Sequence, residues 1–580
     1  MQSKLTILLP ISLLCLSHLA AAQHNHGAEM EDMPAFNSTG DEPMSYWDYP
    51  DNKGLLYTHI AFMVLAFWIL MPMGIAFGIA RSSLHVPTQI LAFGTALVGF
   101  SFAKAYGHSV PHFYAGNIHH SMGWFLFLIL WGQVLVGVVR KIANAVARSR
   151  TDAHYDRLET VHLVGRAESS SSSTTDSHQQ RSQTSEDTLN DDEEFQYNKD
   201  SIVMSPVEME DAEFPSNFAE PEEKPTIVMR AFNTIKHFIP NFIKRAFVFT
   251  AHNPFTITVC RWAHLLTGRV FPLLIFFQTL SGMVVYAGVC RGWEVLGCAA
   301  HLVKGGIFFI YGILTFARYL GVFADRGWAW NYVNNGSKFS FEMIECVLIF
   351  TYGITNTWLE HLGQDETWTH KDFEHASLAF MWWWCGLAGI LIESRSLRRL
   401  LYRASNPDRN DIQSRHEQEQ TYSLNPIPAL TVLMTGVSMG NHHQDTQYSS
   451  SVHYLWGLLI SIAALCRICT YISLYKSKPT SREPSRPPTE ALGAFALICG
   501  AILFMASNAG TMGWLMRNQV DSMFLMNVAV AFSMITLSYV FSLIILKAWA
   551  AKREELKKIA KSHTHIQRHL ALRNDSGFEA

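Results

Sequence analysis

The sequence predicts an all-α polytopic membrane protein with about eleven transmembrane helices. Of its 580 residues, 49% are hydrophobic and only 16% are charged, whereas an average soluble domain carries about 25% charged residues. The apolar residues gather in runs of about 20, the length that a helix needs to cross the hydrocarbon layer. A net charge of -3 gives no electrostatic basis for binding nucleic acid, and nine scattered cysteines do not form a disulfide-built scaffold. The expected surroundings are a lipid bilayer.

The N-terminus has the features of a secretory signal peptide. Residues 1–22 combine one lysine, an apolar run and the small residues Ala20-Ala21-Ala22, which predict cleavage directly afterwards. The acidic tail 23–54 would then lie in the lumen or outside the cell, with Asn37 of an Asn-Ser-Thr sequon as a glycosylation site. An ordinary disordered tail is the first interpretation of this segment, and copper binding by its histidines and methionines is the alternative.

The predicted membrane spans are hydrophobic segments near residues 55–80, 87–106, 118–139, 270–289, 301–320, 340–359, 376–394, 427–440, 452–474, 490–508 and 522–547. The segment 427–440 is short for a hydrocarbon layer of about 30 Å, so a re-entrant segment is the alternative there. Counting it as a crossing, from an outer N-terminus, places the basic residues after the third, seventh, ninth and last spans in the cytosol, as the positive-inside tendency favours. We therefore expect it to cross. We also expect a basic cytosolic tail at 551–580 and a location in the secretory or endomembrane system (plasma membrane, vacuole or endoplasmic reticulum).

A long polar segment divides the spans into two groups. Residues 141–245 are rich in serine and acidic residues and poor in apolar ones, a composition that cannot form a packed core. This predicted disordered cytosolic linker separates a three-span module at 55–140 from a C-terminal membrane domain of about eight spans at 246–550.

The third and fourth spans share a spaced pattern of histidine, glycine and glutamine. The matching residues are His119, Gly123, Gln133 and Gly137 in the third span and His264, Gly268, Gln278 and Gly282 in the fourth. On a helix these positions form one narrow stripe about 27 Å long. Close helix packing explains glycines and a glutamine, but it does not explain a histidine at the head of each stripe. Because ionisable residues are costly in a membrane, these histidines are functional candidates.

Two further histidines complete two pairs. His59 opens the first span on the outer side and His85 opens the second on the inner side, so the topology pairs His59 with His119 and His85 with His264. Two imidazoles from different helices are the axial ligands of a six-coordinate haem b iron. We therefore expect these four histidines to hold two b-type haems per chain, one near each membrane face. His120 is the alternative ligand to His119, and Arg81 lies where it can meet a propionate of the inner haem.

The first four spans resemble the cytochrome b-561 family of di-haem membrane proteins. The resemblance rests on the four histidines, on the Pro72-x-Gly74 turn and on Arg81 with His85-x-x-x-Gln89. It implies electron transfer across a membrane, often from ascorbate. The order of parts in the whole chain resembles the fungal Ytp family of integral membrane proteins, through the segments RWAHLLTGR, CAAHLVKGG, GWAWN and NTWLEHLG. That resemblance implies a b-561-like module followed by a Ytp-type C-terminal membrane domain.

Ionisable residues also gather in the C-terminal domain. Glu342 and Glu345 are one turn apart in the sixth span, and Arg318 and Lys304 on the preceding helix are candidate partners. Structural ion pairing is the first interpretation and proton or ion passage the second. The outer loops carry histidines and carboxylates without fixed ligand spacing, as expected of a solvated loop or, alternatively, of a metal or proton site. These residues are Glu360, His361, Asp365, Glu366, His370, Asp372, Glu374, His375, His442, His443 and Asp445.

Cysteines flank another outer loop. Cys290 and Cys298 are candidates for a disulfide in the oxidising space that the topology assigns to them.

The predicted function is that of a transmembrane electron carrier, a haem-dependent oxidoreductase. The sequence has no glycine-rich nucleotide fingerprint after a strand and no soluble stretch long enough for a flavin or nicotinamide domain. The carrier would therefore need a small-molecule electron donor or a partner reductase, and a ferric or cupric ion is the expected acceptor. The alternatives are a solute or metal-ion transporter and a non-catalytic membrane scaffold.

Overall fold

The computed structural model describes residues 44–114, 116–140, 254–292, 294–331, 339–359, 368, 370–405 and 424–575, and the regular elements in these ranges are helices. The predicted signal peptide, Asn37 and the predicted linker 141–245 lie outside the described residues. The elements are α3 (Lys53–Val64), η2 (Leu65–Leu70), α4 (Met71–Ile79), α5 (His85–Ser109), the helix Ile118–Arg140, α9 (Pro254–Ala287), α10 (Glu294–Tyr319), η3 (Ala324–Arg326), α11 (Phe341–Leu359), α12 (His370–Glu393), α13 (Arg395–Ser405), α15 (Ile427–Gly440), α16 (Gln447–Lys476), α17 (Pro488–Ala506), α18 (Ala509–Arg517) and α19 (Ser522–Asp575).

Nine of the described helices are long and apolar enough to cross a membrane. This confirms the prediction of an all-α polytopic membrane protein. The two other predicted spans correspond to α11, of 19 residues, and to α15, which has only 14 residues and is as short as the sequence indicated.

Two helices extend beyond the predicted spans. Helix α9 is described from Pro254 onward, well before position 270. Helix α19 continues to Asp575, so most of the predicted tail 551–580 is the end of the last helix. The sequence AKREELKKIAK that follows the apolar part of α19 consists largely of strong helix formers, which explains why the helix does not stop there.

The described helices fall into two compact units. One unit combines the residues up to Leu126 with those from Phe271 onward, and the other is Phe127–Val270. Within the first unit, α4 packs against α19. The predicted boundary between a 55–140 module and a 246–550 domain therefore does not coincide with the division into compact units.

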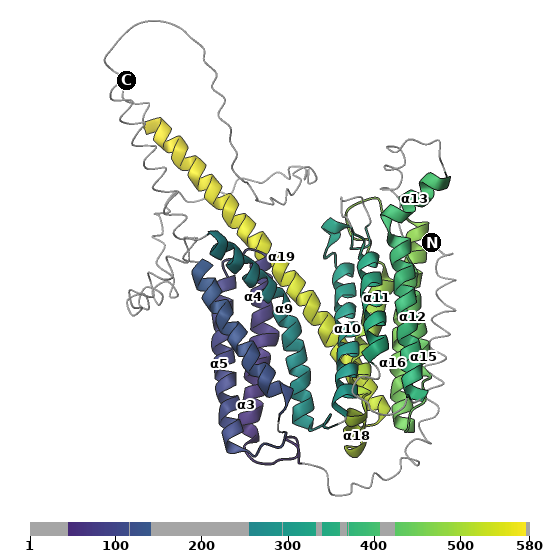
Figure 1. Cartoon of the computed structure of the whole chain (residues 1–580). Coiled ribbons are helices and arrows are strands. Elements are labelled where there is room, and N and C mark those ends of the chain that lie inside the picture. The colour runs from purple at the N-terminus through teal and green to yellow at the C-terminus, as the bar shows by residue number, and fades with distance from the viewer. Residues whose placement is uncertain are drawn as a thin grey trace, which may run out of the picture. The chain divides into compact units, whose positions relative to one another are not determined.

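The first span contains a turn of π-helix, η2, between α3 and α4 (Figure 1). Pro72 lies just after this turn and has no N–H group, so the carbonyl of Trp68, four residues earlier, loses its α-helical donor. A proline and a π-helical turn are both recognised causes of helix irregularity. The hydroxyl of Tyr539 on α19 donates a hydrogen bond to this Trp68 carbonyl.

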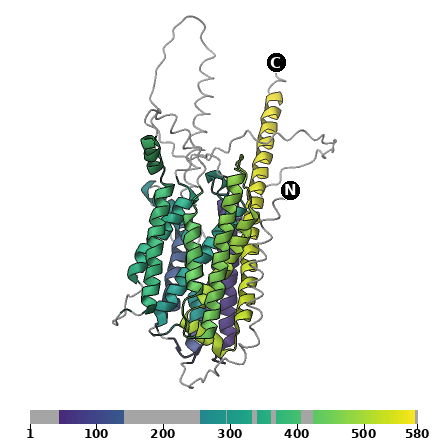
Figure 2. The same ribbon diagram turned by 90° about the vertical axis from the view of Figure 1, so that its right-hand side faces the viewer.

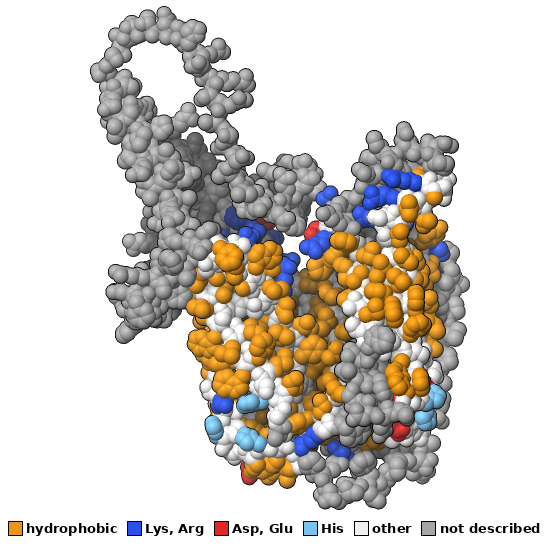
Figure 3. Space-filling model, in the orientation of Figure 1, with side chains coloured by type: hydrophobic (Ala, Val, Ile, Leu, Met, Phe, Trp, Pro, Cys, Tyr) orange, Lys and Arg blue, Asp and Glu red, His pale blue; other side chains and the backbone are white. Residues whose placement is uncertain are grey.

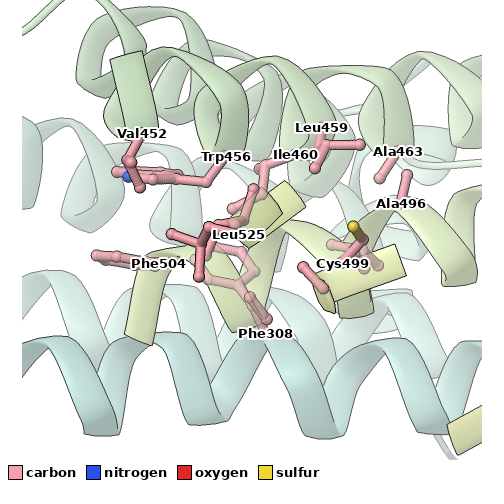
Figure 4. Close-up of a cluster of buried hydrophobic side chains, with 14 of the residues drawn as sticks. Phe308, Val452, Trp456, Leu459, Ile460, Ala463, Ala496, Cys499, Phe504 and Leu525 are labelled. Atoms are coloured by element: carbon pink, nitrogen blue, oxygen red, sulfur yellow. The ribbon is translucent and has the colours of Figure 1, made fainter. Parts of the chain in front are cut away.

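The C-terminal helices of the first unit form a bundle in which α16 and α17 are the most buried spans. Helix α17 packs against α10, α16 and α19, and α15 packs against α16 (Figures 1 and 2). Trp456 and Phe504 stack at the centre of the core with ring centroids 4.3 Å apart (Figure 4). A Cβ atom on Gly457 would lie 2.5 Å from the Gly436 carbonyl oxygen. Glycine therefore allows the α15 and α16 backbones to approach closely, as is common between membrane helices.

The outward faces of these helices are hydrophobic. Large apolar side chains such as Leu348, Trp384 and Phe532 are more than half exposed, and hydrophobic side chains cover much of the face shown in Figure 3. Apolar faces that point away from the core are what contact with lipid tails requires.

Candidate functional site

His59 and His119, the predicted outer pair, lie in the same compact unit. The Nδ1 atom of His59 is 2.9 Å from the carbonyl oxygen of Gly99 on α5. The Nδ1 atom of His119 is 3.1 Å from the carbonyl oxygen of Gln278 on α9. The two imidazoles lie within electrostatic range of each other. The two imidazoles of the predicted outer pair thus come from two different helices of one compact unit.

His85 is the first residue of α5 and is held by glycines of α4. Its Nδ1 atom lies 2.7 Å from the carbonyl oxygen of Gly74. A Cβ atom on Gly78 would lie only 2.9 Å from the same nitrogen, so the ring packs against bare backbone. Gln89, one turn further along α5, donates a hydrogen bond to the carbonyl of Met71 at 3.3 Å. The α4 residues Gly74 and Gly78 therefore hold this histidine.

His264 belongs to the second compact unit, together with Gln133. The Nδ1 atom of His264 lies 2.9 Å from the side-chain oxygen of Gln133, and the amide nitrogen of Gln133 donates to the backbone carbonyl of His264 at 3.3 Å. This second bond fixes which end of the Gln133 amide faces the ring. His85 lies in the first unit and His264 in the second, so each of the predicted inner ligands is anchored within its own unit.

All four histidines have the same tautomer. In each ring Nδ1 faces a carbonyl or amide oxygen, which can only accept a hydrogen bond. The Nδ1 atom of His119 also lies 3.2 Å from the Ser281 hydroxyl, whose own proton is donated to the Gln278 carbonyl. The proton of the neutral imidazole must therefore be on Nδ1, and the lone pair on Nε2. Metal-ligating histidines characteristically donate the N–H of the non-ligating nitrogen to an oxygen in this way.

The repeated stripe pairs each histidine with the glutamine of the other helix. Gln278 donates to the backbone carbonyl of His119 at 2.9 Å, just as Gln133 donates to that of His264. A Cβ atom on Gly282 would lie 2.9 Å from Cε1 of His119, and one on Gly123 would lie 3.3 Å from the Gln278 amide nitrogen. The histidines, glutamines and glycines of one helix therefore contact residues of the same pattern on the other helix. Glycine packing alone would not require these contacts.

These residues fit a b-type haem. Bis-imidazole ligation needs histidines whose Nδ1 atoms are anchored by an acceptor and whose Nε2 atoms carry lone pairs, and the Nδ1 partners of the four rings are acceptors of this kind. The side chain of His120 is exposed. The hydrogen bond described for this residue is made by its backbone N–H, which donates to the Asn117 side chain at 2.9 Å, so the His120 ring is not anchored in the same way. The geometry favours His119 over His120.

Arg81 lies in the turn that joins α4 to α5. Its backbone is left-handed, with φ of 52°, a conformation that is costly for a large side chain. The Arg81 N–H donates to the Gly78 carbonyl at 3.1 Å and the Ser82 N–H donates to the Phe77 carbonyl at 2.9 Å. This is the Schellman arrangement at the end of a helix. The Arg81 side chain is exposed, four residues before His85.

The C-terminal bundle buries a network of charged side chains. Glu342 and Glu345 lie 3.8 and 3.6 Å from the Arg318 guanidinium. Arg467, in the middle of α16, lies 3.1 Å from Glu345 and 2.9 Å from Glu490. The structure supports the ion-pairing interpretation of the two glutamates. The sequence analysis missed Arg467 and Glu490, although an arginine within the apolar run LLISIAALCRICTYISL is itself a signal.

The histidine-rich outer loops are described in part. Glu360, His361, Asp365 and Glu366 lie outside the described residues. Among the others, His442 Nε2 lies 2.8 Å from the Glu374 carboxylate and its ring stacks on that of His375 at 5.1 Å. Within the described part of the chain, no three histidine, cysteine or carboxylate side chains are arranged to hold one metal ion.

Cys290 and Cys298 form a disulfide with their Cα atoms 5.8 Å apart. The Tyr114 hydroxyl donates to the carbonyl of Val289 at 3.0 Å and contacts that of Cys290, and the Arg291 guanidinium lies 4.7 Å from the Tyr114 ring centre. Burial raises the pKa of Tyr114, so its hydroxyl stays a donor at neutral pH. The disulfide is therefore part of a packed loop.

Comparison with known proteins identifies relatives along most of the chain. Residues 274–548 match the family described as "Protein YTP1-like, C-terminal", and residues 40–143 match a "Domain of unknown function (DUF2427)". A membrane protein of Schizosaccharomyces pombe, described as uncharacterized, is 36% identical over 541 residues, which cover 89% of this chain and 99% of the relative.

Two Saccharomyces cerevisiae proteins match more restricted regions. A membrane protein described as uncharacterized is 33% identical over 308 residues, covering 50% of this chain and 48% of the relative. Protein YTP1 is 25% identical over 242 residues, covering 40% of this chain and 45% of the relative. No solved structure matches the chain. The chain belongs to the YTP1-like family of integral membrane proteins.

Proposed function

We propose that this protein is a transmembrane electron carrier in which His59 with His119, and His85 with His264, ligate two b-type haems. A one-electron donor, either a small molecule or a partner reductase, is oxidised on one membrane face. An acceptor such as a ferric or cupric ion gains that electron on the other. The observation that carries the proposal is that the Nδ1 atom of each of the four histidines faces an oxygen acceptor, which assigns the proton to Nδ1 and leaves the lone pair on Nε2.

Bound haem supplies the one-electron couple that no side chain of the protein provides. The chain's own residues orient the ligands. The carbonyls of Gly99, Gly74 and Gln278 and the side chain of Gln133 hold the Nδ1 protons, and such partners increase the basicity of the ligating nitrogen. Arg81 supplies a positive charge in the α4–α5 turn, suited to a haem propionate.

The test is an absorbance spectrum of the purified full-length protein, oxidised and then reduced with dithionite, with a pyridine haemochrome assay. We expect a sharp reduced b-type band and about two haems per chain. His59→Ala, His85→Ala, His119→Ala and His264→Ala should each lose one haem, whereas the matched control His120→Ala should retain both. A colourless protein from cells supplied with haem would refute the proposal, and so would equal haem loss in the His119 and His120 variants.

A further inference from the structure

Glu554 of α19 contacts the turn between α4 and α5. Its Oε1 atom accepts a hydrogen bond from the Ser82 hydroxyl at 3.1 Å, from the Ser83 hydroxyl at 3.2 Å and from the Ser83 backbone N–H at 3.3 Å. Lys557, one helical turn further along α19, donates to the same atom at 2.9 Å and to the Ser83 hydroxyl at 3.2 Å. A single carboxylate oxygen of Glu554 thus accepts three hydrogen bonds from Ser82 and Ser83 of the turn.

This contact joins two residues that are far apart in the sequence but belong to the same compact unit. Glu554 is 472 positions from Ser82 in the chain, and α19 also packs along α4. Helix α19 in turn packs against α10, α16 and α17 of the C-terminal bundle. The last helix therefore links that bundle to the turn that precedes His85.

The turn itself is strained and needs such support. Arg81 has a left-handed backbone without being glycine, and a conformation of this kind persists only where surrounding contacts hold it. Ser82 is buried, and its hydroxyl accepts a bond from the Leu84 N–H at 3.3 Å. The His85 N–H donates to the Ser82 carbonyl at 3.2 Å. The atoms bound to Glu554 are therefore directly connected to the backbone of His85.

We propose that Glu554 is a positioning residue for the inner ligand His85: it fixes the α4–α5 turn and thereby the start of α5. This inference rests on the proposed function, because the property that Glu554 would control is the potential of the haem held by His85. Glu554 touches neither the haem nor a reactant. It acts through Ser82 and Ser83, and it makes the C-terminal helix part of the electron-transfer module.

The experiment compares Glu554→Gln with Glu555→Gln in the full-length protein. Both changes remove one carboxylate charge from α19, but Glu555 is the exposed neighbour. The first readout is hydrogen exchange of a peptide covering residues 80–88, which does not depend on haem. We expect several-fold faster exchange in the Glu554 variant and no change in the Glu555 variant, because the Ser83 N–H loses a charged acceptor.

The second readout is a redox titration that resolves the two haems. The haem assigned to His85 is identified as the one that the His85→Ala variant lacks. In the Glu554 variant, the reduction potential or the low-spin spectrum of this haem should shift, and the other haem serves as an internal control. Faster exchange with no haem shift would overturn the positioning role, and unchanged exchange would overturn the contact itself. A protein without haem would refute the proposed function, and the exchange result would still decide whether Glu554 holds the turn. Ser83→Ala removes one of the three bonds from the turn to Glu554, together with the bond from Lys557, and provides a milder variant should the Glu554 variant not fold.

Discussion

The hydroxyl of Tyr539 donates a hydrogen bond to the backbone carbonyl of Trp68, 471 positions away in the chain. That carbonyl needs an outside donor because Pro72 cannot supply the N–H that a regular helix would offer. An unsatisfied carbonyl in a membrane is costly, so the irregular first span depends on α19.

Tyr539→Phe should therefore lower the free energy of unfolding by about 0.6 to 1 kcal/mol, the usual value of one such bond between membrane helices. Pro72→Ala restores the missing N–H, so adding Tyr539→Phe to that variant should cost less. A double-mutant cycle measured by reversible denaturation checks this. Strictly additive effects would show that the two residues are not coupled.

Glutamine substitutions in the repeated stripe should have unequal effects on the two histidines. Gln133→Leu removes the side-chain oxygen that holds the Nδ1 proton of His264. Gln278→Leu leaves the partner of His119 in place, because that partner is the Gln278 backbone carbonyl. Loss of the hydrogen-bond partner of a ligating histidine typically lowers the affinity for the metal by about 10- to 100-fold. Haem titration of the two variants should show weakened binding only for Gln133→Leu, and equal loss would contradict the assigned bonds.

The glycines of the stripe should also separate into two classes. A Cβ atom at Gly282 would meet His119 at 2.9 Å, whereas one at Gly268 meets no described atom within 4 Å. We expect Gly282→Ala to destabilise the protein by about 1 to 3 kcal/mol through overpacking, and Gly268→Ala to be neutral or slightly stabilising, since alanine favours the helix. Thermal unfolding in detergent measures both. A neutral Gly282→Ala would show that the His119 ring does not lie against that backbone.

The buried network in the C-terminal bundle gives a prediction that is independent of haem. Glu490→Gln leaves the Arg467 guanidinium, which is 7% exposed, without a charge that lies 2.9 Å from it. Removing the sole partner of a buried charge typically costs about 3 to 5 kcal/mol. Because Glu345 remains 3.1 Å from Arg467, we expect a smaller loss of about 1 to 3 kcal/mol. The exposed Glu483 offers a matched control, because Glu483→Gln should change stability little. Similar unfolding midpoints for the two variants would contradict a structural role for this pair.

Much of the fold could be predicted because each membrane span is a run of mostly apolar residues, which can be recognised directly in the sequence. The apolar runs located the helices, and the short segment at 427–440 is a short helix, α15. Helix ends were less predictable. The continuation of α19 to Asp575 depends on helix propensity in polar sequence, which hydropathy does not measure.

The candidate site could be predicted only as a set of residue types. The spacing singled out His119 and His264 but not the oxygen that holds each ring, because the partner of one is a backbone carbonyl and that of the other a side chain. Long-range contacts such as Glu554 with Ser82 leave no periodic signal in one sequence. The same holds for Arg467, whose partners lie on three other helices.

Helix α19 has 54 residues, which corresponds to about 80 Å at the rise of an α-helix, against about 30 Å of hydrocarbon. Glu554 lies well beyond the length needed to cross that layer. The polar part of the helix therefore continues past the apolar part that can cross the bilayer. Through Glu554, Ser82 and Ser83 it ties the turn before His85 to residues outside the hydrocarbon layer.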